Sequence, residues 1–143
     1  MLFRSDLDDL QWEHRGYSGI KGYGAGKIAQ LLSMHLFAKE LEPLGVTINS
    51  MHPGMVRTET GKDNGRFYQW YKKNIIDKYS ASPEISAQAL YYLGASGKVA
   101  GVTDKFFHLT TEEELTPPAM DLDAARALRE RTMELLRQKG VSL

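Results

Sequence analysis

Two side chains with complementary acid–base chemistry stand four residues apart in the first quarter of the chain. Tyr23 and Lys27 open an apolar pattern with helical spacing, so their side chains are expected on one helix face, about one turn apart. A free phenol is a poor acid or base at neutral pH, and a neighbouring ammonium stabilises its phenolate form. Such a pair can give a proton to a carbonyl oxygen or remove one from an alcohol. The same spacing also fits a surface lysine beside a half-buried ring.

A second candidate site follows a short run that is β-branched at its start, Val46-Thr47-Ile48-Asn49-Ser50-Met51. This run is bounded by Gly45 and by Pro53-Gly54, which predicts a strand over residues 46–51. Open α/β sheets bind ligands beyond the carboxyl ends of their strands. Gly54 permits close approach of the backbone to a ligand, and Pro53 stiffens the turn. The alternative is an ordinary turn that ends a strand.

Both candidate sites belong to a longer ordered pattern. The stretch Tyr23-Gly24-Ala25-Gly26-Lys27-Ile28-Ala29 is followed by Ala38-Lys39-Glu40-Leu41, Gly45-Val46-Thr47-Ile48-Asn49 and Pro53-Gly54-Met55-Val56-Arg57-Thr58. In this order and spacing, the segments resemble the C-terminal half of the short-chain dehydrogenase/reductase family. Two further segments resemble its retinol-dehydrogenase-like branch, namely Asp8-Asp9-Leu10-Gln11-Trp12-Glu13 and Phe106-Phe107-His108-Leu109.

The resemblance implies an α/β fold, the C-terminal part of a Rossmann-like doubly wound parallel sheet. It also implies an NAD(P)-dependent oxidoreductase that interconverts a carbonyl and an alcohol by hydride transfer. Tyr23 would be the acid/base, and Lys27 would assist it and hydrogen-bond the nicotinamide ribose. The backbone of Val56 would meet the nicotinamide amide, and the hydroxyl of Thr58 would meet the pyrophosphate. The cofactor-binding residues implied in this way are Tyr23, Lys27, Pro53, Gly54, Val56 and Thr58.

Several of the family's elements are absent from the sequence. No Gly-rich dinucleotide fingerprint, Asn-Ala-Gly element or flanked catalytic serine precedes Tyr23. Gly26 stands where the family usually has Ser, and Asp104 stands where a Gly commonly precedes the last strand. We therefore expect a partial domain over 1–143 whose nucleotide-binding half is missing: a fragment, a truncated gene product or half of a split protein. The isolated chain is expected to bind NAD(P)(H) weakly or not at all.

The elements that must position these residues follow from periodicity. Residues 1–22 are polar and interrupted by glycine, so we expect a loop with a turn of helix near 8–13. Apolar residues three and four apart predict a helix over 23–41. Its expected buried stripe consists of Ala25, Ile28, Ala29, Leu32, Leu36 and Ala38. Further predictions are a helix from Ser82-Pro83 to Gly94 or Gly97, a strand over 105–109 and a helix over 121–139.

The segment 57–80 shows no clear pattern of either type. Its aromatic cluster Phe67–Tyr71 corresponds in position to the family's variable substrate lid, and it fits a packed helical face equally well.

Composition excludes several classes of protein. The 143 residues suit a single domain, and 18 basic residues balance 18 acidic ones without clustering, which argues against nucleic-acid binding. With no cysteine, disulfides and thiolate metal sites are excluded, and neither His52 nor His108 has the spacing of a metal ligand. No signal core and no run of ~20 apolar residues occurs, so we expect no membrane segment and a cytoplasmic location.

Three functions stay open at this point. The first is an oxidoreductase acting on a small carbonyl or alcohol, completed by an N-terminal half supplied from elsewhere. The second is a non-catalytic assembly module, partnered by that half or by a second copy of itself. The third is a remnant without function. The sequence does not give the substrate, the choice between NAD and NADP or the oligomeric state.

Overall fold

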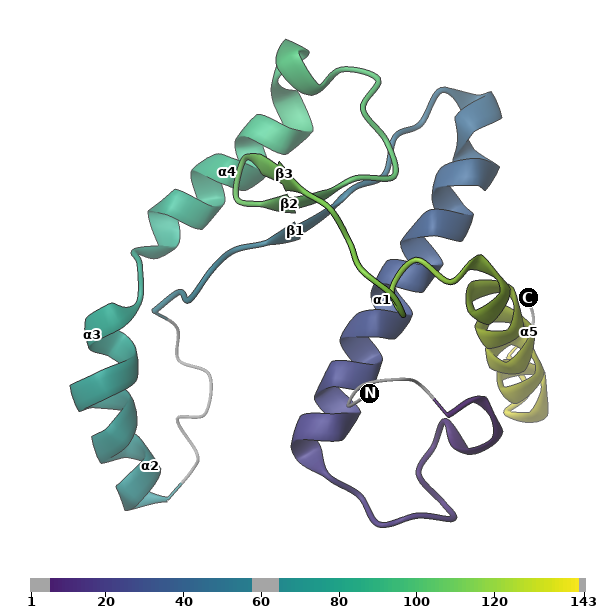
Figure 1. Ribbon diagram of the computed structural model, residues 1–143, viewed down its shortest axis with the longest axis horizontal. Coiled ribbons are helices and arrows are strands. Elements are labelled where there is room, and N and C mark those ends of the chain that lie inside the picture. Colours follow the sequence, from purple (N-terminus) through teal and green to yellow (C-terminus); the bar gives the residue numbers. More distant parts are fainter. Residues whose placement is uncertain (1–5, 58–64, 142–143) are drawn as a thin grey trace.

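A small three-stranded sheet lies at the centre of the molecule, with helices on either side (Figure 1). The computed structural model describes residues 6–57 and 65–141. β1 (Ser50–His52) pairs in parallel with β2 (Phe106–His108), and β2 pairs antiparallel with β3 (Thr111–Glu113). In Figure 1 the sheet lies between α1 (Gly19–Leu41) and α4 (Pro83–Ala95). The predicted α/β arrangement is therefore present.

β1 begins at Ser50, so the predicted strand over 46–51 was wrong for 46–49, and β1 ends one residue later than predicted, at His52. In the stretch before β1, side chains make part of the hydrogen bonds to the neighbouring segment. Asn49 accepts from the backbone amide of Lys105 at 3.0 Å and donates to the carbonyl of Val102 at 2.8 Å. The hydroxyl of Thr103 accepts from the amide of Ile48 at 3.1 Å. The predicted strand over 105–109 is confirmed with slightly narrower bounds, whereas the sequence did not predict β3.

α1 begins at Gly19, four residues before the predicted start at Tyr23, and it ends at Leu41 as expected. The expectation that residues 1–22 form a loop was therefore wrong for 19–22. Leu32 and Ala38 of the predicted stripe are buried, as are Met34 and His35, which the stripe did not include. The rest of the stripe is half-buried.

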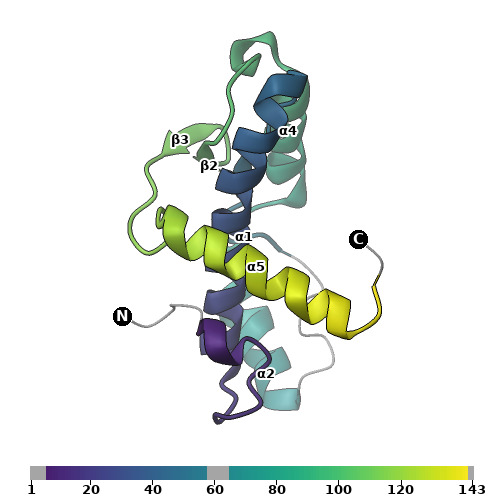
Figure 2. The same cartoon turned by 90° about the vertical axis from the view of Figure 1, so that its right-hand side faces the viewer.

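The main core lies where α5 (Leu122–Gln138) packs across α1, a crossing that Figure 2 shows. Leu32 from α1 and both Ala125 and Leu128 from α5 form its buried centre. An ion pair between Arg129 and Glu40 joins the same two helices at the surface. The predicted helix over 121–139 is confirmed, and its start is explained by Asp121, whose carboxylate accepts from the amide of Ala124 at 2.9 Å.

The remaining elements are short helices. η1 spans Leu7–Asp9, η2 spans Glu42–Leu44 and η4 spans Gly97–Val99. The segment that the sequence left open contains α2 (Arg66–Tyr71), the π-helix η3 (Lys72–Ile76) and α3 (Asp77–Tyr79). The aromatic cluster is thus helical, but it is not a packed face, because Phe67 is 80% exposed and Trp70 is 59% exposed. None of the helices in the described ranges is long and apolar enough to cross a membrane.

Candidate functional site

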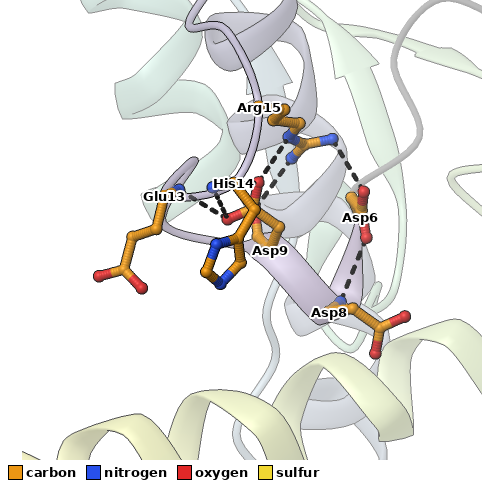
Figure 3. A network of polar contacts seen from close by, with 6 residues as sticks. All are labelled: Asp6, Asp8, Asp9, Glu13, His14 and Arg15. Atoms are coloured by element: carbon orange, nitrogen blue, oxygen red, sulfur yellow. Dashed lines mark hydrogen bonds and ion pairs between the residues drawn. The ribbon is translucent and has the colours of Figure 1, made fainter.

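The loop before α1 is organised around one buried carboxylate, shown in Figure 3. Oδ1 of Asp9 accepts from the backbone amides of Glu13 and His14 at 2.6 and 3.3 Å. Arg15 donates from Nη2 to the backbone carbonyl of Asp9 at 3.0 Å, and its Nη1 lies 3.2 Å from the carboxylate of Asp6. Burying a carboxylate costs free energy, and hydrogen bonds from backbone amides together with a neighbouring guanidinium offset that cost. The loop therefore has a defined path into α1.

Aromatic contacts connect this loop to the first turn of α1. The guanidinium carbon of Arg15 lies 3.9 Å from the ring centroid of Trp12, and Trp12 meets Tyr17 edge-to-face at 5.5 Å between centroids. The ring of Tyr17 then covers Gly22, where an added Cβ would lie 3.0 Å from Cε2 of the tyrosine. Gly22 thus permits a close approach at the residue directly before Tyr23. A glycine in the interior of a helix is unfavourable by local propensity, and at Gly22 the packing of the Tyr17 ring accompanies it.

Tyr23 and Lys27 lie together in the first turns of α1. The Nζ of Lys27 is 5.5 Å from the ring centroid of Tyr23, and it donates to Oε1 of Gln30 at 3.1 Å. The tyrosine is 69% exposed, so its hydroxyl is accessible to a ligand. The predicted sharing of one helix face is thus present in the structure.

The second group follows the carboxyl end of β1, as predicted from the sequence. Gly54 has a φ of 73°, a left-handed conformation that favours glycine, and its amide donates to Nδ1 of His52 at 2.8 Å. The hydroxyl of Ser86, near the start of α4, donates to the carbonyl of Pro53 at 3.2 Å. The turn is therefore held from both sides, by a strand residue and by a helix residue.

Val56 is fixed by a parallel bridge to Ala81. The amide of Ala81 donates to the carbonyl of Met55 at 2.8 Å, and the amide of Arg57 donates to the carbonyl of Ala81 at 3.1 Å. In such a bridge the neighbours of Val56 make the bonds, so the peptide groups of Val56 itself face the opposite side of the segment. Thr58 lies outside the described residues.

The two groups do not touch each other directly. Within residues 6–57 and 65–141, no hydrogen bond or ion pair joins Tyr23 or Lys27 to residues 53–57. In both Figure 1 and Figure 2, the first turns of α1 and α2 lie toward the same lower end of the molecule, below the sheet. Whether the Tyr23 ring and the Pro53-Gly54 turn face one ligand stays a prediction.

Sequence analysis did not predict the contacts of His52, His108 and Ser86 around this turn. His52 and His108 are register partners on β1 and β2, and their rings pack edge-to-face with centroids 5.6 Å apart. Nδ1 of His108 lies 3.6 Å from Oε1 of Glu113. The described residues contain no group of three or more side chains that could hold a metal ion. One local signal could have indicated the contact between His52 and Gly54. The histidine lies at the end of a strand, two residues before the glycine.

Known proteins match this chain over most of its length. A family model described as Enoyl-(Acyl carrier protein) reductase matches residues 11–109. Human retinol dehydrogenase 13 is 32% identical over 127 residues, which cover 86% of this chain and 38% of that protein. Human retinol dehydrogenase 14 is 35% identical over 127 residues, covering 86% of this chain and 37% of that protein.

A bacterial relative matches a shorter region. The 3-oxoacyl-acyl-carrier-protein reductase FabG of Buchnera aphidicola is 36% identical over 98 residues, covering 65% of this chain and 39% of that protein. The chain thus spans less than two fifths of the length of these curated relatives.

A solved structure has a similar fold. The crystal structure of an uncharacterised protein from Mycobacterium paratuberculosis aligns with a TM-score of 0.58 at 24% sequence identity, covering 94% of this chain and 45% of that chain. This similarity confirms the predicted fold class and carries no information on activity.

Proposed function

Because the chain belongs to the short-chain dehydrogenase/reductase family, in a retinol-dehydrogenase-like part of it, we propose that it carries the acid–base half of an NAD(P)-dependent oxidoreductase site. The reaction would interconvert a carbonyl and an alcohol. The observation that carries the proposal is the position of Nζ of Lys27, 5.5 Å from the ring centroid of the exposed Tyr23. Family membership supports the interpretation of Tyr23 and Lys27 as a functional pair.

The proton step uses these two residues. In carbonyl reduction, the hydroxyl of Tyr23 donates a hydrogen bond to the carbonyl oxygen and gives up its proton as negative charge develops there. The ammonium of Lys27 then stabilises the phenolate that remains. In alcohol oxidation the phenolate takes the proton back. A bound nicotinamide would supply or accept the hydride.

The described residues after β1 fit a nicotinamide cofactor. The peptide groups of Val56 face away from Ala81, which supports a role for them in donating to and accepting from a carboxamide. The left-handed turn at Gly54 carries no side chain that would obstruct an approaching ring. Lys27 would meet the ribose, Pro53 would keep the turn rigid, and Thr58 would meet the pyrophosphate. Gly54 and Val56 belong to a turn that Ser86 and Ala81 hold in place.

The chain alone is proposed to bind the cofactor weakly and to turn over no substrate. It covers 38% of the length of human retinol dehydrogenase 13, and it contains no Gly-rich phosphate-binding turn. Catalysis requires the substrate and the hydride donor to be held together, which Tyr23 and Lys27 cannot do without the contacts of the adenosine end. The substrate class we propose is a small carbonyl or alcohol.

A second candidate function is that of a non-catalytic assembly module. Large apolar side chains are exposed on both α1 and α4, among them Ile20, Phe37, Leu90 and Tyr91. Surfaces of this kind fit either a complementing N-terminal half or a second copy of the chain. Sedimentation of the purified chain distinguishes the two, because only self-association depends on the concentration of this chain alone.

The test begins with calorimetric titration of NADH and NADPH into the chain. The same titration is then made with the N-terminal part of human retinol dehydrogenase 13 added in trans, and turnover of an aldehyde and retinoid panel is measured. We expect weak binding by the chain alone and some turnover by the pair. In the pair, Tyr23→Phe and Lys27→Met should lower kcat, whereas Tyr92→Phe, at a part-buried tyrosine of α4, is the matched control. Turnover that survives Tyr23→Phe would contradict the assignment, and micromolar cofactor binding by the chain alone would show that it holds more of the site.

A further inference from the structure

The helical segment 66–79, here called the aromatic arm, presents its apolar side chains outward. Phe67, Trp70, Tyr71 and Ile75 are all exposed, and their spacing of three, four and eight residues places them on one helix face. Tyr68, Gln69 and Ile76 on the other face are partly buried. In Figure 1 the arm lies on the side of the molecule away from α5. The side facing solvent is therefore the more apolar one, the reverse of an ordinary surface helix.

Polar contacts at the inner side keep the arm in this orientation. Nζ of Lys72 lies 3.3 Å from Oδ1 of Asp77, and Nη2 of Arg57 donates to the backbone carbonyl of Asp77 at 3.1 Å. The hydroxyl of Ser80 donates to the carbonyl of Ile76 at 2.7 Å. The bond from Arg57 joins the arm to the segment after β1, whereas the other two lie within the arm and at its end.

Positive charge surrounds the exposed aromatic face. The arm contains four basic residues, Arg66, Lys72, Lys73 and Lys78, and one acidic residue, Asp77, although the whole chain has no net charge. Arg66, Lys73 and Lys78 are exposed. The partner of this surface must therefore offer negative charge beside an apolar region. A second copy of the arm would bring like charges together, which disfavours self-pairing.

We propose that the aromatic arm docks on an anionic phospholipid surface, with its axis in the plane of the membrane. Tryptophan and tyrosine rings favour the boundary between headgroups and acyl chains, and Phe67 and Ile75 supply apolar area without a polar group to satisfy. Exposed basic residues beside them meet the negative headgroups. Nucleic acid or an acidic protein would use the charges but would leave the aliphatic Ile75 without a function.

The experiment is co-sedimentation of the full chain with vesicles of phosphatidylcholine alone, or of phosphatidylcholine and phosphatidylserine in equal amounts. The chain has two tryptophans, so Trp12→Phe leaves Trp70 as the only tryptophan, which is excited selectively over the tyrosines. We expect stronger binding to the vesicles that contain phosphatidylserine, a blue shift of Trp70 emission on binding, and weaker binding as salt is raised. Equal binding to both vesicle types, or an unshifted emission, would overturn the proposal.

Variants separate the contribution of the aromatic ring to vesicle binding from the contribution of the positive charges. Trp70→Ser should weaken binding about tenfold, from the loss of a partly inserted ring. Lys73→Gln and Lys78→Gln should each weaken binding to anionic vesicles about fivefold, with little change for neutral vesicles. Tyr91→Ser removes a ring of α4 that is even more exposed, at 77% compared with 59% for Trp70, and should have no effect. If Trp70→Ser instead abolishes a concentration-dependent dimer observed without lipid, the partner is a second copy and the membrane proposal is wrong.

Discussion

Nδ1 of His35, in the middle of α1, lies 2.5 Å from Oδ1 of Asp104, the residue that leads into β2. On the other side of the ring, Nε2 lies 3.1 Å from the carbonyl oxygen of Ala119, in the segment before α5. Both nitrogens of the buried ring therefore have a hydrogen-bonding partner. A single side chain therefore joins α1, the sheet and the start of the last helix.

Replacing this histidine should destabilise the fold. His35→Ala should lower the free energy of unfolding by about 2–4 kcal/mol, because it removes one buried and one part-buried hydrogen bond and leaves a cavity. The measurement is urea denaturation followed by circular dichroism. A loss below about 0.5 kcal/mol would show that the contact does not hold the elements together.

The partner residue offers a matched pair of variants. Asp104 has a φ of 61°, in the left-handed region that glycine adopts without strain. Asp104→Gly loses the carboxylate but gains backbone freedom there, whereas Asp104→Ala loses the carboxylate and keeps the strain. Asp104→Ala should therefore be less stable than Asp104→Gly by about 1 kcal/mol. The reverse order would contradict this explanation.

Gly22 and Gly26 form a second matched pair within α1. An added Cβ at Gly26 meets nothing within 4 Å, so Gly26→Ala should raise the free energy of unfolding by about 1 kcal/mol. Gly22→Ala should gain less, because its Cβ must displace the Tyr17 ring from Trp12. In a Tyr17→Ala background the two substitutions should raise the free energy of unfolding by equal amounts. A double-mutant cycle of thermal unfolding measures this difference between backgrounds. An equal gain in the unaltered background would show that the Tyr17 contact is unimportant.

Gly54 and Gly45 are both left-handed, with φ of 73° and 68°, but only Gly54 has a neighbour at the Cβ position, Nε2 of His108 at 3.4 Å. Each substitution by alanine should cost about 1–2 kcal/mol of stability from backbone strain. Only Gly54→Ala should shift the histidine ring signals in an NMR spectrum and weaken cofactor binding by the complemented protein. Identical effects of the two variants on cofactor affinity would remove Gly54 from the site.

The hairpin of β2 and β3 offers a test by pH. The hydrogen bond from Lys105 to Glu112, 2.7 Å long, raises the pKa of the lysine above its ordinary value of 10.5. A group with a raised pKa in the folded state stabilises the fold fully below the unfolded value and loses that contribution as pH rises through the folded value. The effect of the pair should therefore disappear at strongly alkaline pH.

Glu112→Gln should return the pKa of Lys105 toward its ordinary value in an NMR titration. Glu114 provides the control, because its charge contributes least to the raised pKa of Lys105. Glu114→Gln should therefore leave most of the increase in the pKa of Lys105. A Lys105 titration that Glu112→Gln does not change would show that the two side chains are not paired in solution.

The sequence by itself determined the helices whose first residues depend on the residues next to them in the chain. Ser82-Pro83 predicted the start of α4, where Pro83 is the first helical residue although the Ser82 side chain makes no capping hydrogen bond. The helix predicted over 121–139 begins directly after Asp121, which caps it. The shared face of Tyr23 and Lys27 followed in the same way, since a spacing of four residues specifies it on any helix. The family, and with it the proposed chemistry, also followed from ordered motifs.

Contacts between distant residues decided the rest. Gly22 lies in α1 with the ring of Tyr17 packed where a side chain would otherwise lie, a contact that helix propensity does not contain. β3 exists because it pairs with β2, although all three of its residues are exposed and show no alternating pattern. Burial of His35, the acceptor role of His52 and the outward aromatic face of 66–79 likewise depend on which segments meet in space. Free energy from hydrogen bonds and packing between segments overrides local preferences of about 1 kcal/mol, and those long-range contacts are specified only by the tertiary structure.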